Sequence, residues 1–122
     1  MNEEVKYCLA KFIKFVTDEL NINKPFKVVL SKKRSDDLKT YAYYQPSSGL
    51  IKIYSKNRGL ADVLRSVAHE LIHHQQNESG LLNKPHPDIG GKIEDDANSI
   101  AGQFVKKFGY IHPDFLIYDT TV

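Results

Sequence analysis

Residues 60–80 of the chain read LADVLRSVAHELIHHQQNESG, and the spacing of the apolar residues in this stretch decides how the chain folds. These residues recur at steps of three and four, which is typical of an amphipathic helix with one buried face. They are Leu60, Val63, Leu64, Val67, Ala68, Leu71 and Ile72. The pattern predicts a helix that starts at Leu60, stops near Asn77 to Gly80 and buries this face in the core.

His69 and His73 lie on the opposite side of the same helix, about 40° apart at about 100° per residue. Two imidazoles one helical turn apart can bind one metal ion. Glu70 lies beside this row, where its carboxylate could take a proton from a bound water. We interpret the motif as a zinc site, and an accidental match is the competing interpretation. His74 falls back toward the apolar face and is left outside the site.

A catalytic zinc site normally has three protein ligands and keeps its fourth position for water. A later helical pattern, in residues 93–108, offers three carboxylates in Glu94, Asp95 and Asp96. Only Glu94 borders the apolar face of that helix, and we predict it as the third ligand. Asn98 follows one turn later on the same edge, where its amide could accept the spare ring proton of a ligating histidine.

His86 is the alternative third ligand, because a histidine downstream of the motif completes a different class of zinc site. It lies in a Pro-flanked loop, so the sequence does not determine whether its side chain can reach the two motif histidines. The extended pattern His-x-x-Gly-x-x-His is also missing, since Gln76 and Ser79 stand where that pattern has glycine and histidine. We therefore prefer Glu94.

The remaining patterns predict one α+β domain. A chain of 122 residues is long enough for one compact domain and too short for two ordinary ones. An apolar stripe from Val5 to Leu20 predicts an N-terminal helix, and Gly109 is a natural stop for the third helix. Alternating residues predict a small antiparallel or mixed sheet of three or four strands. The expected strands are residues 26–30, 41–45 and 50–54, with a tight reversal at 46–49.

Charge and composition exclude several classes of protein. The net charge is +2, and Lys32-Lys33-Arg34 is the only dense basic run, which disfavours a nucleic acid partner. Cys8 is the only cysteine, so neither an intrachain disulfide nor a thiolate metal cage can form. The first twenty residues contain no uninterrupted apolar stretch. We therefore expect neither a secretory signal nor a membrane span, and a cytoplasmic protein.

The sequence His69-Glu70-Leu71-Ile72-His73 followed by Glu94-Asp95-Asp96-Ala97-Asn98 resembles the gluzincin metallopeptidases, and most closely the minimal, single-domain minigluzincins. The resemblance covers roughly residues 5–109. It implies a zincin-like upper subdomain with a backing helix, a small sheet, an active-site helix and a glutamate helix. It also implies a zinc metalloendopeptidase acting on a peptide or protein substrate, with Glu70 as general base. An edge strand, either 41–45 or 50–54, would align that substrate.

The end of the chain raises two further expectations. Larger gluzincins supply an oxyanion donor from a separate subdomain, and here only Tyr110, His112 and Tyr118 follow the glutamate helix. Ordinary packing of these rings is the alternative. By the same resemblance, an extended tail at 110–122 would cover the cleft and keep the enzyme latent. The competing function is a non-catalytic zinc-binding or protein-interaction module, which has no need of a base at Glu70.

Overall fold

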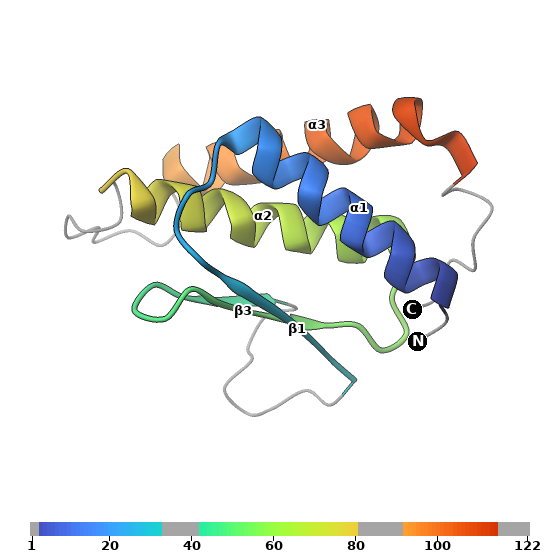
Figure 1. Ribbon diagram of the computed structural model, residues 1–122, viewed down its shortest axis with the longest axis horizontal. Coiled ribbons are helices and arrows are strands. Elements are labelled where there is room, and N and C mark those ends of the chain that lie inside the picture. Colours follow the sequence, from blue (N-terminus) through green and yellow to red (C-terminus); the bar gives the residue numbers. More distant parts are fainter. Residues whose placement is uncertain (1–2, 33–41, 81–91, 115–122) are drawn as a thin grey trace.

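The computed structural model describes residues 3–32, 42–80 and 92–114, and within them the chain forms three helices and a three-stranded sheet (Figure 1). The helices are α1 (Glu3–Leu20), α2 (Leu60–Glu78) and α3 (Lys92–Ile111). The strands are β1 (Lys27–Ser31), β2 (Ala42–Gln45) and β3 (Leu50–Tyr54). This arrangement confirms the predicted α+β class.

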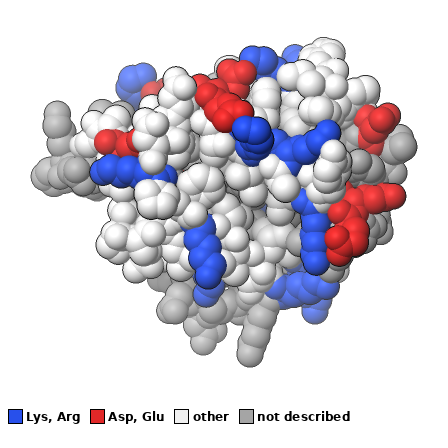
Figure 2. All heavy atoms as spheres, in the orientation of Figure 1, with Lys and Arg blue, Asp and Glu red and all other residues white. Residues whose placement is uncertain are grey.

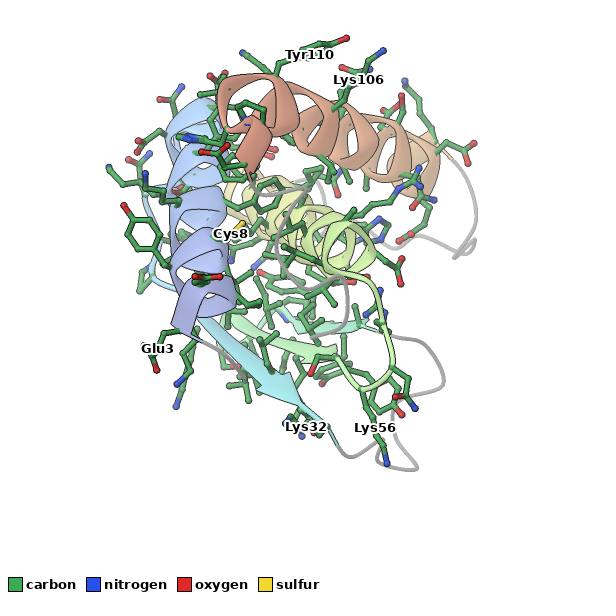
Figure 3. All side chains as sticks on the ribbon, turned by 90° about the vertical axis from the view of Figure 1, so that its right-hand side faces the viewer. Glu3, Cys8, Lys32, Lys56, Lys106 and Tyr110 are labelled. Carbon is green, nitrogen blue, oxygen red and sulfur yellow. The ribbon has the colours of Figure 1, made fainter. Side chains whose placement is uncertain are left out.

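Helix α2 is the centre of the fold. All three helices lie on one side of the sheet, and α2 contacts α1, α3 and the strands β2 and β3 (Figure 1). Every residue of its predicted apolar face is buried, which confirms the periodicity argument. Helix α1 buries Cys8 on its inner face (Figure 3). None of the helices in the described ranges is long and apolar enough to cross a membrane.

The sheet is mixed and has the order β1-β3-β2. Strand β3 is central, parallel to β1 and antiparallel to β2, so β1 and β2 are the two edges. Ile51 and Ile53 are fully buried and belong to the core cluster that α2 completes. Because side chains alternate along a strand, Lys52 points to the face of the sheet that the helices leave open.

Gly49 closes the predicted reversal between β2 and β3. Its φ is +69°, a left-handed conformation that favours glycine. A Cβ atom at this position would lie 2.7 Å from the carbonyl oxygen of Pro25, so the backbone approaches too closely for any side chain. The Gly49 carbonyl accepts a hydrogen bond of 3.0 Å from the amide of Lys27, which fixes the start of β1 beside the turn.

The expected end of the third helix is wrong. Helix α3 continues through Gly109 to Ile111, because Phe108 is buried against α1 and the amide of His112 still bonds to the Phe108 carbonyl at 2.8 Å. Packing of the residue before Gly109 thus overrides the tendency of glycine to end a helix. Residues 110 and 111 of the predicted extended tail are therefore helical, and residues 115–122 lie outside the described ranges.

Arg58 joins the end of the sheet to the first turns of α2. Its buried guanidinium donates hydrogen bonds of 2.6 Å to the carbonyl of Tyr54 and 2.6 Å to the hydroxyl of Ser66, and it pairs with Asp62 at 2.8 Å. Helix α2 has no side-chain N-cap at Gly59. These contacts with Arg58 therefore hold the helix in position relative to β3.

His74 joins the other end of α2 to β2. Its Nε2 donates to the carbonyl of Lys24 at 3.0 Å, so in the neutral ring Nδ1 accepts the hydroxyl proton of Tyr44 at 2.8 Å. The Tyr44 oxygen in turn accepts a hydrogen bond of 3.1 Å from the amide of Asn77. The ring also packs edge-on against Phe26 and Tyr44. His74 is a packing residue, as the sequence indicated.

Replacing Tyr44 with phenylalanine should lower the free energy of unfolding by about 1–3 kcal/mol, because the buried Nδ1 atom of His74 loses its partner. Tyr43→Phe is the matched control, since Tyr43 is on the same strand and 40% exposed. We expect that control to stay within about 0.5 kcal/mol of the parent chain. Urea titrations followed by circular dichroism measure both, and equal losses would contradict a structural role for the Tyr44 hydroxyl.

Candidate metal centre

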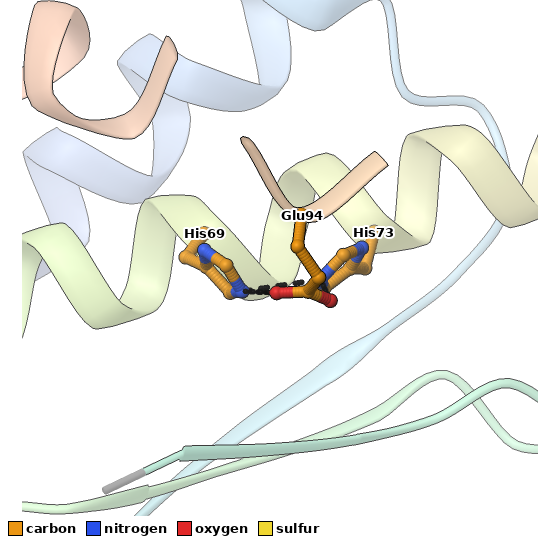
Figure 4. Close-up of side chains that lie close together, drawn as sticks. All are labelled: His69, His73 and Glu94. Carbon is orange, nitrogen blue, oxygen red and sulfur yellow. Dashed lines mark hydrogen bonds and ion pairs between the residues drawn. The ribbon is translucent and has the colours of Figure 1, made fainter. Parts of the chain in front are cut away.

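Helices α2 and α3 bring His69, His73 and Glu94 together (Figure 4). The two histidines lie one turn apart on α2, and Glu94 reaches them from the first turn of α3. Glu94 Oε1 lies 2.8 Å from His73 Nε2, and Oε2 lies 3.2 Å from His69 Nε2. The two Nε2 atoms are 3.1 Å apart. The structure thus places the three predicted ligands in one cluster.

This cluster fits a tetrahedral zinc ion. Zinc binds imidazole nitrogen at about 2.0–2.1 Å, so two ligand atoms on a tetrahedral ion lie about 3.3 Å apart. The two Nε2 atoms, at 3.1 Å, are close to that value, and each lies 2.8 or 3.2 Å from one of the two oxygens of Glu94. Two nitrogens and one carboxylate are also the donor set of a known class of catalytic zinc site.

Electrostatics at the cluster favours a neutral histidine with a free lone pair. Burial lowers the pKa of His69 below its usual value, and the nearby ring of His73 lowers it further. The carboxylate of Glu94 and a hydrogen bond with Asn98 act in the opposite direction. A metal ion binds only the unprotonated nitrogen, so a lowered pKa keeps His69 ready to bind at neutral pH.

Gln76 is a residue of the site that the sequence argument missed. Its Oε1 lies 2.8 Å from His73 Nδ1, and both side chains are buried. The amide oxygen can only accept, so a proton sits on Nδ1, and in the neutral ring the lone pair of Nε2 faces Glu94. The sequence could have predicted this contact, because position 76 lies three residues after His73 on the same helical face.

Helix α3 separates its acidic residues as expected. Glu94 faces the histidines, Asp95 is exposed, and Asp96 pairs with Lys92 at 3.2 Å. Asn98, one turn after Glu94, is exposed and hydrogen-bonds the side chain of His69. It therefore occupies the position that was predicted for an orienting residue.

Glu70 lies beside the three ligands and is only 6% exposed. Its Oε1 is 4.0 Å from His69 Nε2, and no described residue forms a hydrogen bond with its carboxyl group. Burial, with a smaller contribution from the charge of Glu94, raises the pKa of Glu70 to about 8. A cation between the ligands would offset that charge and favour the carboxylate form.

Two expected oxyanion donors are not near the ligands. Tyr110 follows Glu94 by sixteen residues, which is about 24 Å along α3 at about 1.5 Å per residue, and it is 78% exposed (Figure 3). His112 stacks on Phe108 and lines a cavity of about 270 Å³ between α1 and the end of α3. Tyr118 and the alternative ligand His86 lie outside the described residues.

Comparison of the chain with models of known protein families, with curated proteins and with solved structures found no significant match. The case for a function therefore depends on the residues and geometry of the site.

We expect Gln76→Leu to weaken zinc binding by about 10–100-fold, because loss of the acceptor leaves the tautomer and ring orientation of His73 unfixed. Gln75→Leu is the control, since it makes the same change one residue away, outside the hydrogen bond to His73. Gln76→Glu keeps an acceptor and should retain zinc. Competition with a chelator measures affinity, and nitrogen NMR of His73 measures the tautomer. An unchanged tautomer in Gln76→Leu would rule out this role.

Proposed function

We propose that the protein is a zinc-dependent metallopeptidase of the gluzincin type. In this proposal His69, His73 and Glu94 bind zinc, Glu70 is the general base, and the fold corresponds to a zincin-like upper subdomain. The motif supports the two histidines and the base, and the 2.8 and 3.2 Å contacts of Glu94 support the third ligand.

The observation that carries the proposal is the position of Glu70. A purely structural zinc site needs no carboxylate beside its ligands, and a carboxyl group that is largely removed from water is costly to keep in its charged form. Glu70 is nevertheless buried next to His69 without a hydrogen-bond partner among the described residues. A carboxyl group in that place can move protons at the metal, and this favours a catalytic site over a structural one.

When bound, zinc would activate a water molecule and polarise the carbonyl of the peptide bond. Glu70 would accept the proton of that water and then deliver it to the nitrogen of the leaving amine. Gln76 and Asn98 would keep the two imidazoles oriented while this happens. The reaction is the hydrolysis of a peptide bond.

Strand β2 is the candidate for aligning the substrate. Among the described residues β3 is the central strand and β2 is an edge strand, so β2 is the better candidate of the two strands considered. The charge of Glu70 contributes to the raised pKa of Tyr44, after the larger effect of burial. This electrostatic coupling means that β2 runs close to the proposed base.

Replacing Glu70 with glutamine should lower peptidase activity by about 10²–10⁴-fold while zinc binding persists, because the base is lost and the ligands remain. Asp95→Asn is the control, since it removes an exposed carboxylate next to Glu94 and should leave both properties unchanged. Hydrolysis of an unstructured protein and metal analysis of the purified variants measure the two effects.

Full activity in Glu70→Gln would contradict the proposed mechanism. Zinc bound to the parent chain without any hydrolysis would contradict the proposed enzyme, and it would leave the alternative of a non-catalytic zinc-binding or interaction module.

A further inference from the structure

A row of facing residues joins α2 to α3 and continues beyond the metal centre. Each step of four residues back along α2 meets a step of four residues forward along α3, which is one helical turn on each helix. The facing pairs are His73 with Glu94, His69 with Asn98, and Arg65 with Gly102. The third pair lies outside the ligand cluster and brings an arginine next to it.

The guanidinium of Arg65 lies against a position of α3 that has no side chain. A Cβ atom at residue 102 would lie 3.4 Å from Nη2 of Arg65 and 3.9 Å from its Nε and Cζ atoms. A long side chain at this position would cover the guanidinium, whereas Gly102 leaves it uncovered on that side. Arg65 is exposed, although it borders the contact between the two helices.

Arg65 has no charged partner within the part of the chain that the structure describes. It forms neither an ion pair nor a hydrogen bond there. The acidic residue one turn before it on α2, Asp62, pairs with Arg58 at 2.8 Å. Basic and acidic side chains are intermixed over the helices in the view of Figure 2, and some of them pair, as Lys14 does with Asp18. The charge of Arg65 is therefore available to a ligand.

Arg65 and the proposed base lie on opposite sides of the two histidines. At about 100° per residue, Arg65 is rotated by about 40° from His69 in one direction, and Glu70 by about 100° in the other. Side chains on a helix also lean toward its N-terminus, which moves the guanidinium further from Glu70. A substrate bound at the metal would therefore have the base on one side and a positive charge on the other.

The guanidinium is near enough to the metal centre to contact a substrate there, but not at the cleaved bond itself. Arg65 precedes His69 by one turn, which is about 6 Å along α2, and Gly102 follows Glu94 by about 12 Å along α3. An extended polypeptide advances by about 3.3 Å per residue. The guanidinium would therefore meet a residue about two to four positions from the bond that is cleaved.

We propose that Arg65 binds a carboxylate of the substrate at this distance from the cleaved bond. This inference rests on the proposed peptidase function and adds a substrate class to it, namely polypeptides that place an acidic side chain or a chain end beside Arg65. A guanidinium holds a carboxylate through two parallel hydrogen bonds, which a neutral side chain cannot match. A divalent ion held by two neutral imidazoles and one carboxylate keeps a net positive charge, which attracts the same group.

Binding can be measured without turnover on the full chain carrying Glu70→Gln and loaded with zinc. The first probe is a labelled flexible peptide with one glutamate in a neutral sequence and an amidated end. The second has glutamine in place of that glutamate, and the third has glutamine and a free C-terminal carboxylate. The test variants are Arg65→Gln and Arg65→Lys. The control is Lys106→Gln, which removes an exposed positive charge that projects from α3 away from α2 (Figure 3).

We expect the first or the third peptide to bind more tightly than the second, and the tighter of the two identifies the source of the carboxylate. Arg65→Gln should lose about five- to tenfold in affinity for that peptide, as expected for an exposed ion pair with two hydrogen bonds. Arg65→Lys should keep part of the preference, because it retains the charge and loses the paired hydrogen bonds. Affinity of the Arg65 variants for the second peptide, and of Lys106→Gln for all three, should change less than about twofold.

No preference for either peptide with a carboxylate would overturn the proposal. Equal losses in Arg65→Gln and Lys106→Gln would also overturn it, because they would indicate a non-specific effect of charge. A loss in Arg65→Gln that is as large for the second peptide would mean that Arg65 supports the structure of the site and does not bind the substrate group.

The outcome for Arg65 is separable from the outcome for the proposed enzyme. Binding to the chain with Glu70→Gln reports on Arg65, and hydrolysis of the same peptides by the parent chain reports on the metal centre. Hydrolysis without a preference for a carboxylate would reject the role of Arg65 and keep the enzyme. Binding of a carboxylate that depends on Arg65, without any hydrolysis, would reject the enzyme and keep the carboxylate site.

Discussion

The carboxylate of Glu94 facing two imidazoles of the neighbouring helix is the interaction on which the rest of the site depends. His73 presents a lone pair to it because Gln76 accepts the proton on the other ring nitrogen, and burial lowers the pKa of His69. Three acceptor groups that converge in this way repel one another unless a proton or a metal cation lies between them. The cluster therefore links the packing of α3 on α2 to a group of side chains that could hold a metal ion.

The position of that cluster is set by contacts at both ends of α2. Arg58 joins the first turns of the helix to the end of β3, and His74 joins its last turns to Tyr44 on β2. Between them the apolar face of α2 packs on the buried isoleucines of β3. A rotation of the helix that moved the histidines would break both sets of buried hydrogen bonds, which makes the geometry of the ligands part of the fold.

The features that the sequence predicted correctly are those that helical periodicity determines. The apolar face of α2 and the choice of Glu94 over Asp95 both follow from positions on a helix. The structure buries that face and places Glu94 beside the two histidines. The strand order and the end of α3 depend on contacts between residues far apart in the sequence. The sequence alone therefore predicts that the helix ends at Gly109, because it does not reveal that Phe108 packs on α1. Helical spacing could also have predicted the contact of Gln76 with His73. The distance of Tyr110 from Glu94 could not be predicted in this way, because it depends on how far α3 extends.

A crystal structure of the zinc-loaded chain with anomalous scattering at the zinc edge tests the central claim most directly. We predict one anomalous peak bonded to the Nε2 atoms of His69 and His73 and to a carboxylate oxygen of Glu94, each at about 2.0–2.2 Å. No peak at this position, or a zinc ion held by His86 with Glu94 turned away, would contradict the account.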